Sequence, residues 1–200
     1  VSQKISIMIL LLSEEKLKSP TVAYEMLEDN IGYVQVTEFD EVTSDQYIAA
    51  VDDLKAQGME GLIVDIRDNP GGLLSCVVDM LDYMLPEGTI VYTEDKNGEG
   101  DTYTSDAEHY FDLPLAVLVN GNSASASEIF SGAIQDYETG TIIGTQTFGK
   151  GIVQSILPFN DGSAIKITVS RYFTPRGTCI HKEGITPDVE VELNEELKTN

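Results

Sequence analysis

Apolar and polar side chains follow one another along this chain with two different periods, which predict where strands and helices lie. The apolar run at residues 7–12 and the charged residues behind it predict a strand and a loop, and the run is too short to cross a membrane. Residues 31–36 predict a strand, and residues 44–57 place apolar side chains at helical spacing. We expect Ser44 to be the N-cap of that helix and Gly58 to end it.

The middle of the chain repeats an order of strand, turn and helix. A nearly continuous apolar run at 62–66 is followed by a turn at 68–72 and a helix at 73–84. A second run at 115–119 leads through an Asn-Gly-Asn turn into a helix at 125–137. Continuous apolar runs of this length are typical of strands in a buried parallel sheet.

The C-terminal half alternates apolar and polar positions, as antiparallel strands do. Shorter strands are expected at 89–93, 142–143, 152–157, 163–173 and 189–191. Residues 94–113 are polar and acidic and predict an exposed hairpin or loop. The pattern predicts an α/β fold with a mixed sheet and flanking helices. We expect an N-terminal segment, one core domain and an acidic tail, at 1–22, 23–193 and 194–200.

Composition and charge exclude several classes of protein. The chain has 200 residues, of which 42% are hydrophobic, enough for one large core. Its net charge of −22 repels phosphate and anionic lipid, so no nucleic acid or membrane surface is expected as a partner. The chain has only two cysteines, Cys76 and Cys179, and two histidines, which are too few for a cysteine-rich zinc site or a disulfide scaffold. No metal or cofactor is expected. The two cysteines are interpreted as buried free thiols, and their pairing stays open. Because the first residue is not Met, we expect a longer precursor.

Two segments imitate binding loops. Residues 144–150 nearly spell a P-loop, but Gly151 stands where Ser or Thr should hold magnesium, and a strand-like segment follows. The acidic segment at 95–106 imitates a calcium loop. It has Glu99 and Asp106 where Asp or Asn and a bidentate Glu belong. Neither nucleotide nor calcium binding is favoured.

Residues 122–128 place three serines alternating with alanines where a buried strand meets a helix. Ser125 and Glu128 have the spacing of a capping box, which is the simpler interpretation of this window. A serine at a helix N-terminus also presents its hydroxyl beside unpaired backbone N–H groups, which can hold an oxyanion. The turn at Gly71 and Gly72 ends a neighbouring strand and is a second source of such donors.

A nucleophilic serine needs a base. His109 and His181 have no evident carboxylate partner in the sequence. Lys150 lies among glycines and apolar residues, which would favour the neutral amine that a base requires. Taken alone, an exposed loop lysine is the simpler interpretation. Gln154, four residues on, would lie on the same face of a strand and could hold the amine.

Several motifs in a fixed order resemble those of the carboxy-terminal processing proteases, also called tail-specific proteases. They are DIRDNPGG at 65–72, NSASASE at 122–128 and TFGKGIVQ at 147–154, followed by TPRG at 174–177 and GITPD at 184–188. The resemblance runs from about residue 20 to residue 191. It implies a fold of the Clp-protease and crotonase type, and it implies that the chain is the family's catalytic core without the PDZ domain.

The resemblance also assigns roles. It implies that Ser125 is the nucleophile, Lys150 its base and Gln154 the residue that supports the lysine. It implies an oxyanion hole made by the N–H of Ala126 and of one glycine in the Asn-Pro-Gly-Gly turn, with Gly71 and Gly72 both open.

The resemblance implies that the protein is a serine endopeptidase that cleaves near the C-termini of proteins. It implies that the substrates are proteins or peptides with free C-termini. The resemblance implies an extracytoplasmic location, in the cell envelope or secreted, with a membrane anchor in the longer protein. It leaves a homodimer open. The alternative is a non-catalytic ligand-binding module, as in retinoid-binding repeats of similar fold. The presence of both Ser125 and Lys150 favours the enzyme.

Overall fold

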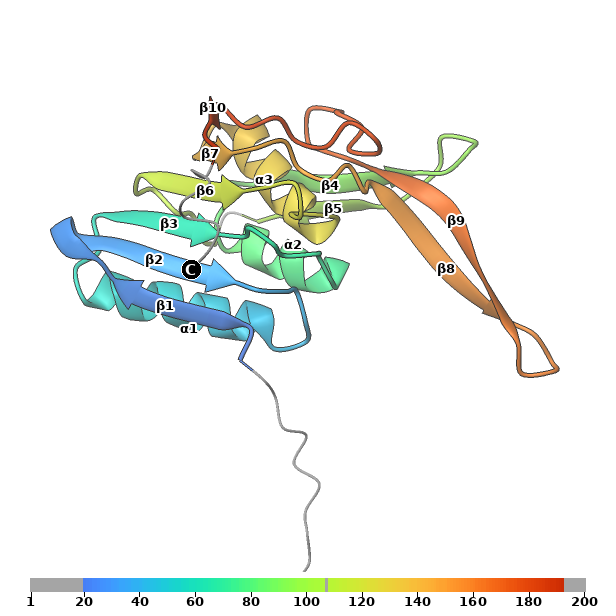
Figure 1. Cartoon of the computed structure of the whole chain (residues 1–200), viewed down its shortest axis with the longest axis horizontal. Coiled ribbons are helices and arrows are strands. Elements are labelled where there is room, and N and C mark those ends of the chain that lie inside the picture. The colour runs from blue at the N-terminus through green and yellow to red at the C-terminus, as the bar shows by residue number, and fades with distance from the viewer. Residues whose placement is uncertain (1–19, 107, 193–200) are drawn as a thin grey trace, which may run out of the picture.

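The computed structural model describes residues 20–106 and 108–192, which form two β-sheets and three α-helices (Figure 1). The larger sheet has six strands, in the order β1 (Val22–Met26), β2 (Ile31–Val36), β3 (Gly61–Asp65), β6 (Leu115–Val119), β7 (Thr141–Gly144) and β10 (Val189–Glu190). Every neighbouring pair is parallel except β1 and β2. This sheet is therefore mixed, as predicted, but its antiparallel strand is β1 and not one of the C-terminal strands, which form a sheet of their own.

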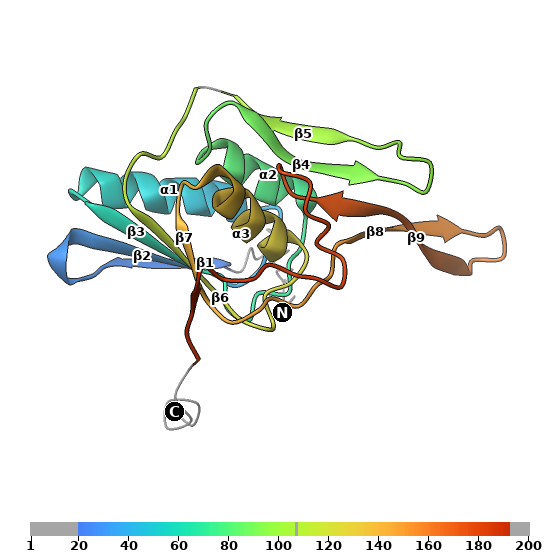
Figure 2. The same ribbon diagram turned by 90° about the horizontal axis from the view of Figure 1, so that it is seen from above.

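The described helices pack on one face of the six-stranded sheet, as Figure 2 shows. They are α1 (Thr43–Ala56), α2 (Leu74–Asp82) and α3 (Ala126–Tyr137). Along β6, alternate residues such as Val117 are fully buried, and the residues between them are half-buried. The ring of Phe130 lies 6.3 Å from that of Tyr47 and 6.5 Å from that of Phe39, all three in the core. This packing fixes the ends of β3 and β6, where the chain turns into α2 and α3.

The smaller sheet is antiparallel and has four strands, in the order β5 (Thr102–Ser105), β4 (Gly88–Glu94), β9 (Ala164–Phe173) and β8 (Ile152–Pro158). Only three residues at the end of β9 pair with β4. Beyond them β8 and β9 pair with each other alone and project from the body as a two-stranded arm (Figure 1). The rings of Tyr92 and Phe173 stack 5.1 Å apart at its base.

Most predicted elements are confirmed within a residue or two, and the corrections are local. The first helix begins at Thr43, so Ser44 lies inside it and is not its N-cap. The Thr43 hydroxyl instead accepts the Asp40 N–H at 2.9 Å. Gly58 does follow the end of α1, with a φ of 91° that favours glycine.

Strand β1 was not predicted, because its residues lack the expected alternation, whereas the hairpin that was one of the two expectations for residues 94–113 is confirmed. β1 is an edge strand with three exposed residues in succession. β5 makes the acidic segment a hairpin with β4. A short 3₁₀ turn, Glu28–Asn30, joins β1 to β2. The apolar run at 7–12 and the tail at 194–200 lie outside the described residues, and the division into three segments stays a prediction. No described helix is long and apolar enough to cross a membrane.

Candidate active site

Ser125 is the last residue before α3, in the connection that follows β6. Its φ of 56° and ψ of −112° are unusual for a residue other than glycine. The serines on either side are fully buried and hold this connection against the neighbouring strand end. The Ser123 hydroxyl donates to the Ile66 carbonyl at 2.8 Å, and the Ser127 hydroxyl to the Asn69 carbonyl at 2.9 Å. Ser125 itself is only partly buried. The alternating serines therefore divide into two structural residues and one accessible residue.

Asn69 organises the turn between β3 and α2. Its side chain is fully buried and donates to the Val36 carbonyl at 2.9 Å, while its Oδ1 accepts the Gly71 N–H at 2.9 Å. Its own carbonyl accepts the Ala124 N–H at 3.1 Å. Asn69 thus ties the turn to β2 and to the residue before Ser125. From the sequence, Asn69 could be identified only as a turn residue, because its hydrogen-bond partners are distant along the chain.

The two glycines of the turn have different roles. The Gly71 N–H is bound to Asn69, and the Gly71 carbonyl accepts the Phe39 N–H at 3.0 Å. Because a trans peptide points its N–H away from its carbonyl, the Gly72 N–H faces away from Phe39. Within the described chain, neither this N–H nor that of Ala126 donates a hydrogen bond. The geometry favours Gly72 and Ala126 as the oxyanion donors.

Gly71 is needed for a different reason, which is its contact with Ser125. A Cβ added to Gly71 would lie 2.8 Å from the Ser125 Cβ and 3.0 Å from the Ala126 nitrogen. Gly71 also has a φ of 102°. Only a residue without a side chain allows the turn to approach the start of α3 this closely.

Substituting either glycine with alanine should lower kcat by about 10²-fold or more, the usual effect of losing one oxyanion donor. In Gly71→Ala the new methyl displaces Ser125, and in Gly72→Ala it meets the Phe39 carbonyl at 2.0 Å. Steady-state kinetics on a peptide substrate measures both effects. Gly58→Ala is the matched control, since Gly58 has a φ of 91° but no atom within 4 Å of the added Cβ. Full activity in both turn variants would remove the turn from the mechanism.

Glu128 connects the two predicted catalytic residues. Its side chain is 0% exposed and lies in the first turn of α3. Its Oε2 accepts the Ser125 N–H at 2.8 Å and the Lys150 N–H at 2.8 Å. Its Oε1 accepts the Thr147 hydroxyl at 2.7 Å and the Gly149 N–H at 2.6 Å. One carboxylate therefore holds the backbones of Ser125 and Lys150 side by side. The sequence predicted only the contact between Glu128 and Ser125, as part of a capping box.

Glu128→Gln should reduce kcat at least about tenfold with a smaller change in KM. The amide presents N–H groups where one carboxylate oxygen accepts two, so buried donors lose their partner, at a cost of roughly 1–3 kcal/mol each. The loop that carries Lys150 would then be free to move relative to Ser125. Kinetics together with urea unfolding tests this, with Glu138→Gln, an exposed residue at the end of α3, as control. Unchanged kcat in Glu128→Gln would show that the contact is structural only.

Lys150 lies on the loop between β7 and β8, and its side chain is exposed. It lines a hollow of about 340 Å³ whose residues come from three connections: Asp68, Pro70, Asn122, Ala124, Phe148 and Lys150. Phe148 is 65% exposed at this hollow. The structure therefore brings Lys150 to Ser125, but the described chain does not enclose its amine in apolar surroundings as the sequence suggested. Gln154 is exposed on β8 and forms no described hydrogen bond to the lysine.

Asp68 is a further charged group of this hollow that the sequence did not single out. Its Oδ1 accepts the Asn122 side-chain amide at 2.7 Å and that of Asn120 at 3.0 Å. These hydrogen bonds, that of Asn122 first, hold the pKa of Asp68 below its usual range. The hollow thus carries a fixed carboxylate as well as the lysine.

The two histidines differ in their distance from the lysine loop. The ring of His109 packs 5.2 Å from that of Tyr83. His181 adjoins the lysine loop through its backbone, since a Cβ added to Gly151 would lie 2.4 Å from the His181 nitrogen. The buried Nδ1 of His181 has no hydrogen-bond partner among the described residues. Neither histidine hydrogen-bonds to Ser125 there.

The segments that imitate binding loops have other structures. The near P-loop is followed by β8, not by a helix. In the acidic hairpin, Asp95 accepts the N–H groups of Asn97 and Glu99, so its carboxylate closes its own turn. No group of three or more potential ligands in the described chain is placed to hold a metal ion.

Cys76 and Cys179 are free thiols. Cys76 is buried, and burial raises the pKa of its thiol to about 11. Cys179 is only half-buried.

An ion pair fixes the end of β3 just before the turn. The Arg67 guanidinium lies 2.6 Å from the buried Asp65 carboxylate, which also accepts the Tyr33 hydroxyl at 2.7 Å. Burial raises the pKa of Asp65, but the hydrogen bonds from Arg67 and Tyr33 outweigh it and hold that pKa below its usual range. Burial, together with Asp65, raises the pKa of Tyr33 to about 12.

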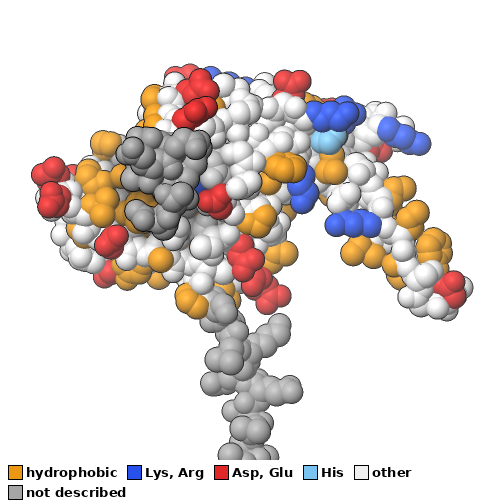
Figure 3. All heavy atoms as spheres, viewed as in Figure 1, with side chains coloured by type: hydrophobic (Ala, Val, Ile, Leu, Met, Phe, Trp, Pro, Cys, Tyr) orange, Lys and Arg blue, Asp and Glu red, His pale blue; other side chains and the backbone are white. Residues whose placement is uncertain are grey.

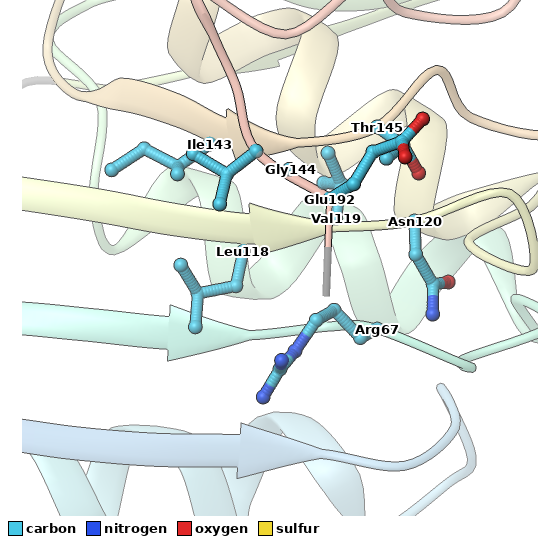
Figure 4. A pocket seen from close by; sticks show the side chains of 9 residues that line it. Arg67, Leu118, Val119, Asn120, Ile143, Gly144, Thr145 and Glu192 are labelled. Atoms are coloured by element: carbon cyan, nitrogen blue, oxygen red, sulfur yellow. The ribbon is translucent and has the colours of Figure 1, made fainter. Parts of the chain in front are cut away.

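A second hollow, of about 350 Å³, lies on the sheet face opposite the helices (Figure 4). Arg67, Leu118 and Ile143 are among the residues that line it. Neither Ser125 nor Lys150 contributes to its lining. It is therefore distinct from the predicted site.

Comparisons with known proteins show a likeness that covers most of this chain. The model of peptidase family S41 matches residues 30–191. The carboxyl-terminal-processing protease of Synechocystis sp. is 44% identical over 163 residues, which is 82% of this chain and 38% of that protein. The carboxy-terminal processing protease CtpA of Bacillus subtilis is 38% identical over 188 residues, 94% of this chain and 40% of that protein. The chain thus spans about two fifths of the length of these curated relatives.

A solved structure, that of a photosystem II D1 C-terminal processing protease, superposes with a TM-score of 0.82 at 35% identity. The match covers 89% of this chain and 50% of that one. The predicted α/β fold is confirmed by this likeness.

Proposed function

The chain belongs to peptidase family S41, and from this premise we propose that it is the catalytic core of a serine endopeptidase that cleaves proteins near their C-termini. One observation carries the proposal beyond family membership. The backbones of Ser125 and Lys150 are bound to the same carboxylate oxygen of Glu128, and the N–H groups of Gly72 and Ala126 donate no hydrogen bond within the described residues. This arrangement suits a serine nucleophile, a lysine base and an oxyanion hole.

In the proposed reaction, the Ser125 hydroxyl attacks the scissile carbonyl carbon while its proton passes to the neutral amine of Lys150. The N–H groups of Gly72 and Ala126 stabilise the negative oxygen of the tetrahedral intermediate. As the peptide C–N bond breaks, the Lys150 ammonium gives its proton to the leaving amine. Water then hydrolyses the acyl-enzyme, with Lys150 accepting and returning the proton. Gln154, which makes no hydrogen bond to Lys150 in the described chain, is the residue proposed to orient the lysine amine when substrate is bound.

The exposure of Lys150 has a consequence for this reaction. Only the neutral amine of a lysine can accept the serine proton, and surrounding water favours the ammonium form. Burial under the substrate would expel water from the hollow beside Phe148. We therefore infer that a substrate covering the hollow assists the transfer of the Ser125 proton to Lys150.

Proteins or peptides with free C-termini are the proposed substrates, and the proposed location is extracytoplasmic, in the cell envelope or secreted. A direct test is to incubate the protein with a reporter that ends in a defined apolar tail and to identify products by mass spectrometry. We expect cuts within the tail and none with Ser125→Ala. Cuts confined to other parts of a folded reporter would contradict C-terminal processing.

A further inference from the structure

Strand β8 has an open edge that begins two residues after Lys150. It is the last strand of the four-stranded sheet, so β9 pairs with one side of it and no described strand pairs with the other. The N–H of Tyr172 donates to the Gly151 carbonyl at 3.0 Å and the N–H of Phe159 to the Ser163 carbonyl at 2.8 Å. Odd-numbered residues at both ends of β8 thus bond inward, toward β9.

The backbone groups on the open edge follow from this register. In an antiparallel pair, residues alternate between bonding to the partner strand and pointing away from it. Ile152, Gln154 and Ile156 therefore direct their N–H and carbonyl groups outward. Pro158 follows at the next outward position and, having no N–H, ends the series.

This edge has little of the protection that open edges usually have. Natural edge strands are shielded by charges, prolines, bulges or covering loops, because an open edge invites another strand. Residues 151–160 carry no charged side chain, although the whole chain has 34 acidic residues. The protection of this edge is limited to one bulge, which shifts the register between Val153 and Gln154, and to Pro158 at the far end of the strand.

The arm also exposes apolar side chains, which Figure 3 shows in orange along its length. Ile156 is 67% exposed and Leu157 51%. The other large exposed apolar residues of the arm are Phe159, Ile165, Ile167 and Val169. An extended peptide lying along β8 would bury part of this surface and would gain main-chain hydrogen bonds.

We propose that the open edge of β8 binds the substrate as an added β-strand, which leads the scissile bond to Ser125 and Lys150. This inference rests on the proposed function and specifies the chemistry of recognition. The bound group is an extended, largely uncharged peptide backbone, read through Ile152, Gln154 and Ile156. Because main-chain groups do the pairing, the edge accepts many sequences and favours apolar side chains.

The test measures how a fluorescein-labelled decapeptide binds to the non-cleaving Ser125→Ala chain. The C-terminal half of the peptide is uncharged and apolar, and fluorescence anisotropy reports its binding. Ile156→Pro removes one outward N–H and should weaken binding about tenfold. Lys166→Pro is the matched control. Lys166 lies opposite Ile156 in register and points its N–H to the other edge of the arm, so binding should be unchanged. Equal weakening by both variants, or by neither, would overturn the proposal.

A second measurement does not depend on how the variants fold. In a series of decapeptides, each peptide is N-methylated at a different single residue. Affinity should fall for methylation at every second position, where the N–H faces β8, and should be normal at the positions between. A uniform response along the peptide would overturn the proposal. If sedimentation shows that Ile156→Pro dissociates a dimer while peptide affinity is unchanged, a second copy occupies the edge instead. Labelling of Ser125 by a small fluorophosphonate in the unsubstituted chain reports the proposed function separately.

Discussion

Replacing Ser125 with alanine should abolish proteolysis while changing the free energy of unfolding by no more than about 1 kcal/mol. The substitution removes the only group that can form the acyl-enzyme in this scheme. It keeps the backbone N–H of residue 125, which donates to Glu128 at 2.8 Å, so the junction with α3 remains fastened. Alanine at a φ of 56° is strained much as serine is. Activity assays and urea unfolding of the same preparation measure the two effects.

Ser127→Ala is the control for Ser125→Ala. The Ser127 hydroxyl is buried and donates to the Asn69 carbonyl, which also accepts the Ala124 N–H. Its loss should cost about 1 kcal/mol of stability and leave most of the activity. An inactive Ser127→Ala together with an active Ser125→Ala would show that the nucleophile lies two residues further along.

Lys150→Arg and Lys150→Ala should both lower kcat/KM by about 10⁴-fold or more, the scale of losing one member of a catalytic unit. Arginine keeps the positive charge and much of the bulk of lysine, but a guanidinium does not deprotonate in proteins. It cannot accept the Ser125 proton. For the same reason the kcat/KM of the unsubstituted protein should rise with pH, as the ammonium gives way to the amine.

The pH profile separates this base from a histidine. His109→Ala and His181→Ala should keep the rising limb, because neither ring hydrogen-bonds to Ser125 in the described structure. His181 is the sharper comparison, since its backbone adjoins Gly151 and its Nδ1 is buried without a partner. An active Lys150→Arg, or a rising limb that disappears with His181, would replace the Ser–Lys assignment with a Ser–His one.

Local pattern predicted the central elements of this fold well. The runs that became β3 and β6 are apolar because strands between neighbours in a covered sheet bury their side chains. The start of α3 could be found because a strand end, small residues and a capping Glu lie within a few positions. Edge strands were harder to predict from the sequence. Strand β1 carries exposed residues in succession, and its pairing with β2 holds it in the sheet.

The sequence suggested candidate site residues, but it did not reveal the contacts that join them. Glu128 was visible as a cap, yet its bonds to Gly149 and Lys150 join segments about twenty residues apart, which no local pattern reveals. The choice between Gly71 and Gly72 likewise depended on Asn69, whose side chain occupies one N–H. The surroundings of Lys150 differ from expectation for a related reason. Apolar neighbours in sequence do not enclose a side chain that the fold leaves at the surface.

The most direct test of the central claim is to map the covalent adduct of a fluorophosphonate by tandem mass spectrometry. With the unsubstituted protein we expect the label on Ser125, accumulating faster as the pH rises, and no detectable label on the same residue in Lys150→Ala. A label on Ser123, Ser127 or another residue, or equal labelling of Ser125 with and without Lys150, would contradict a serine nucleophile activated by that lysine.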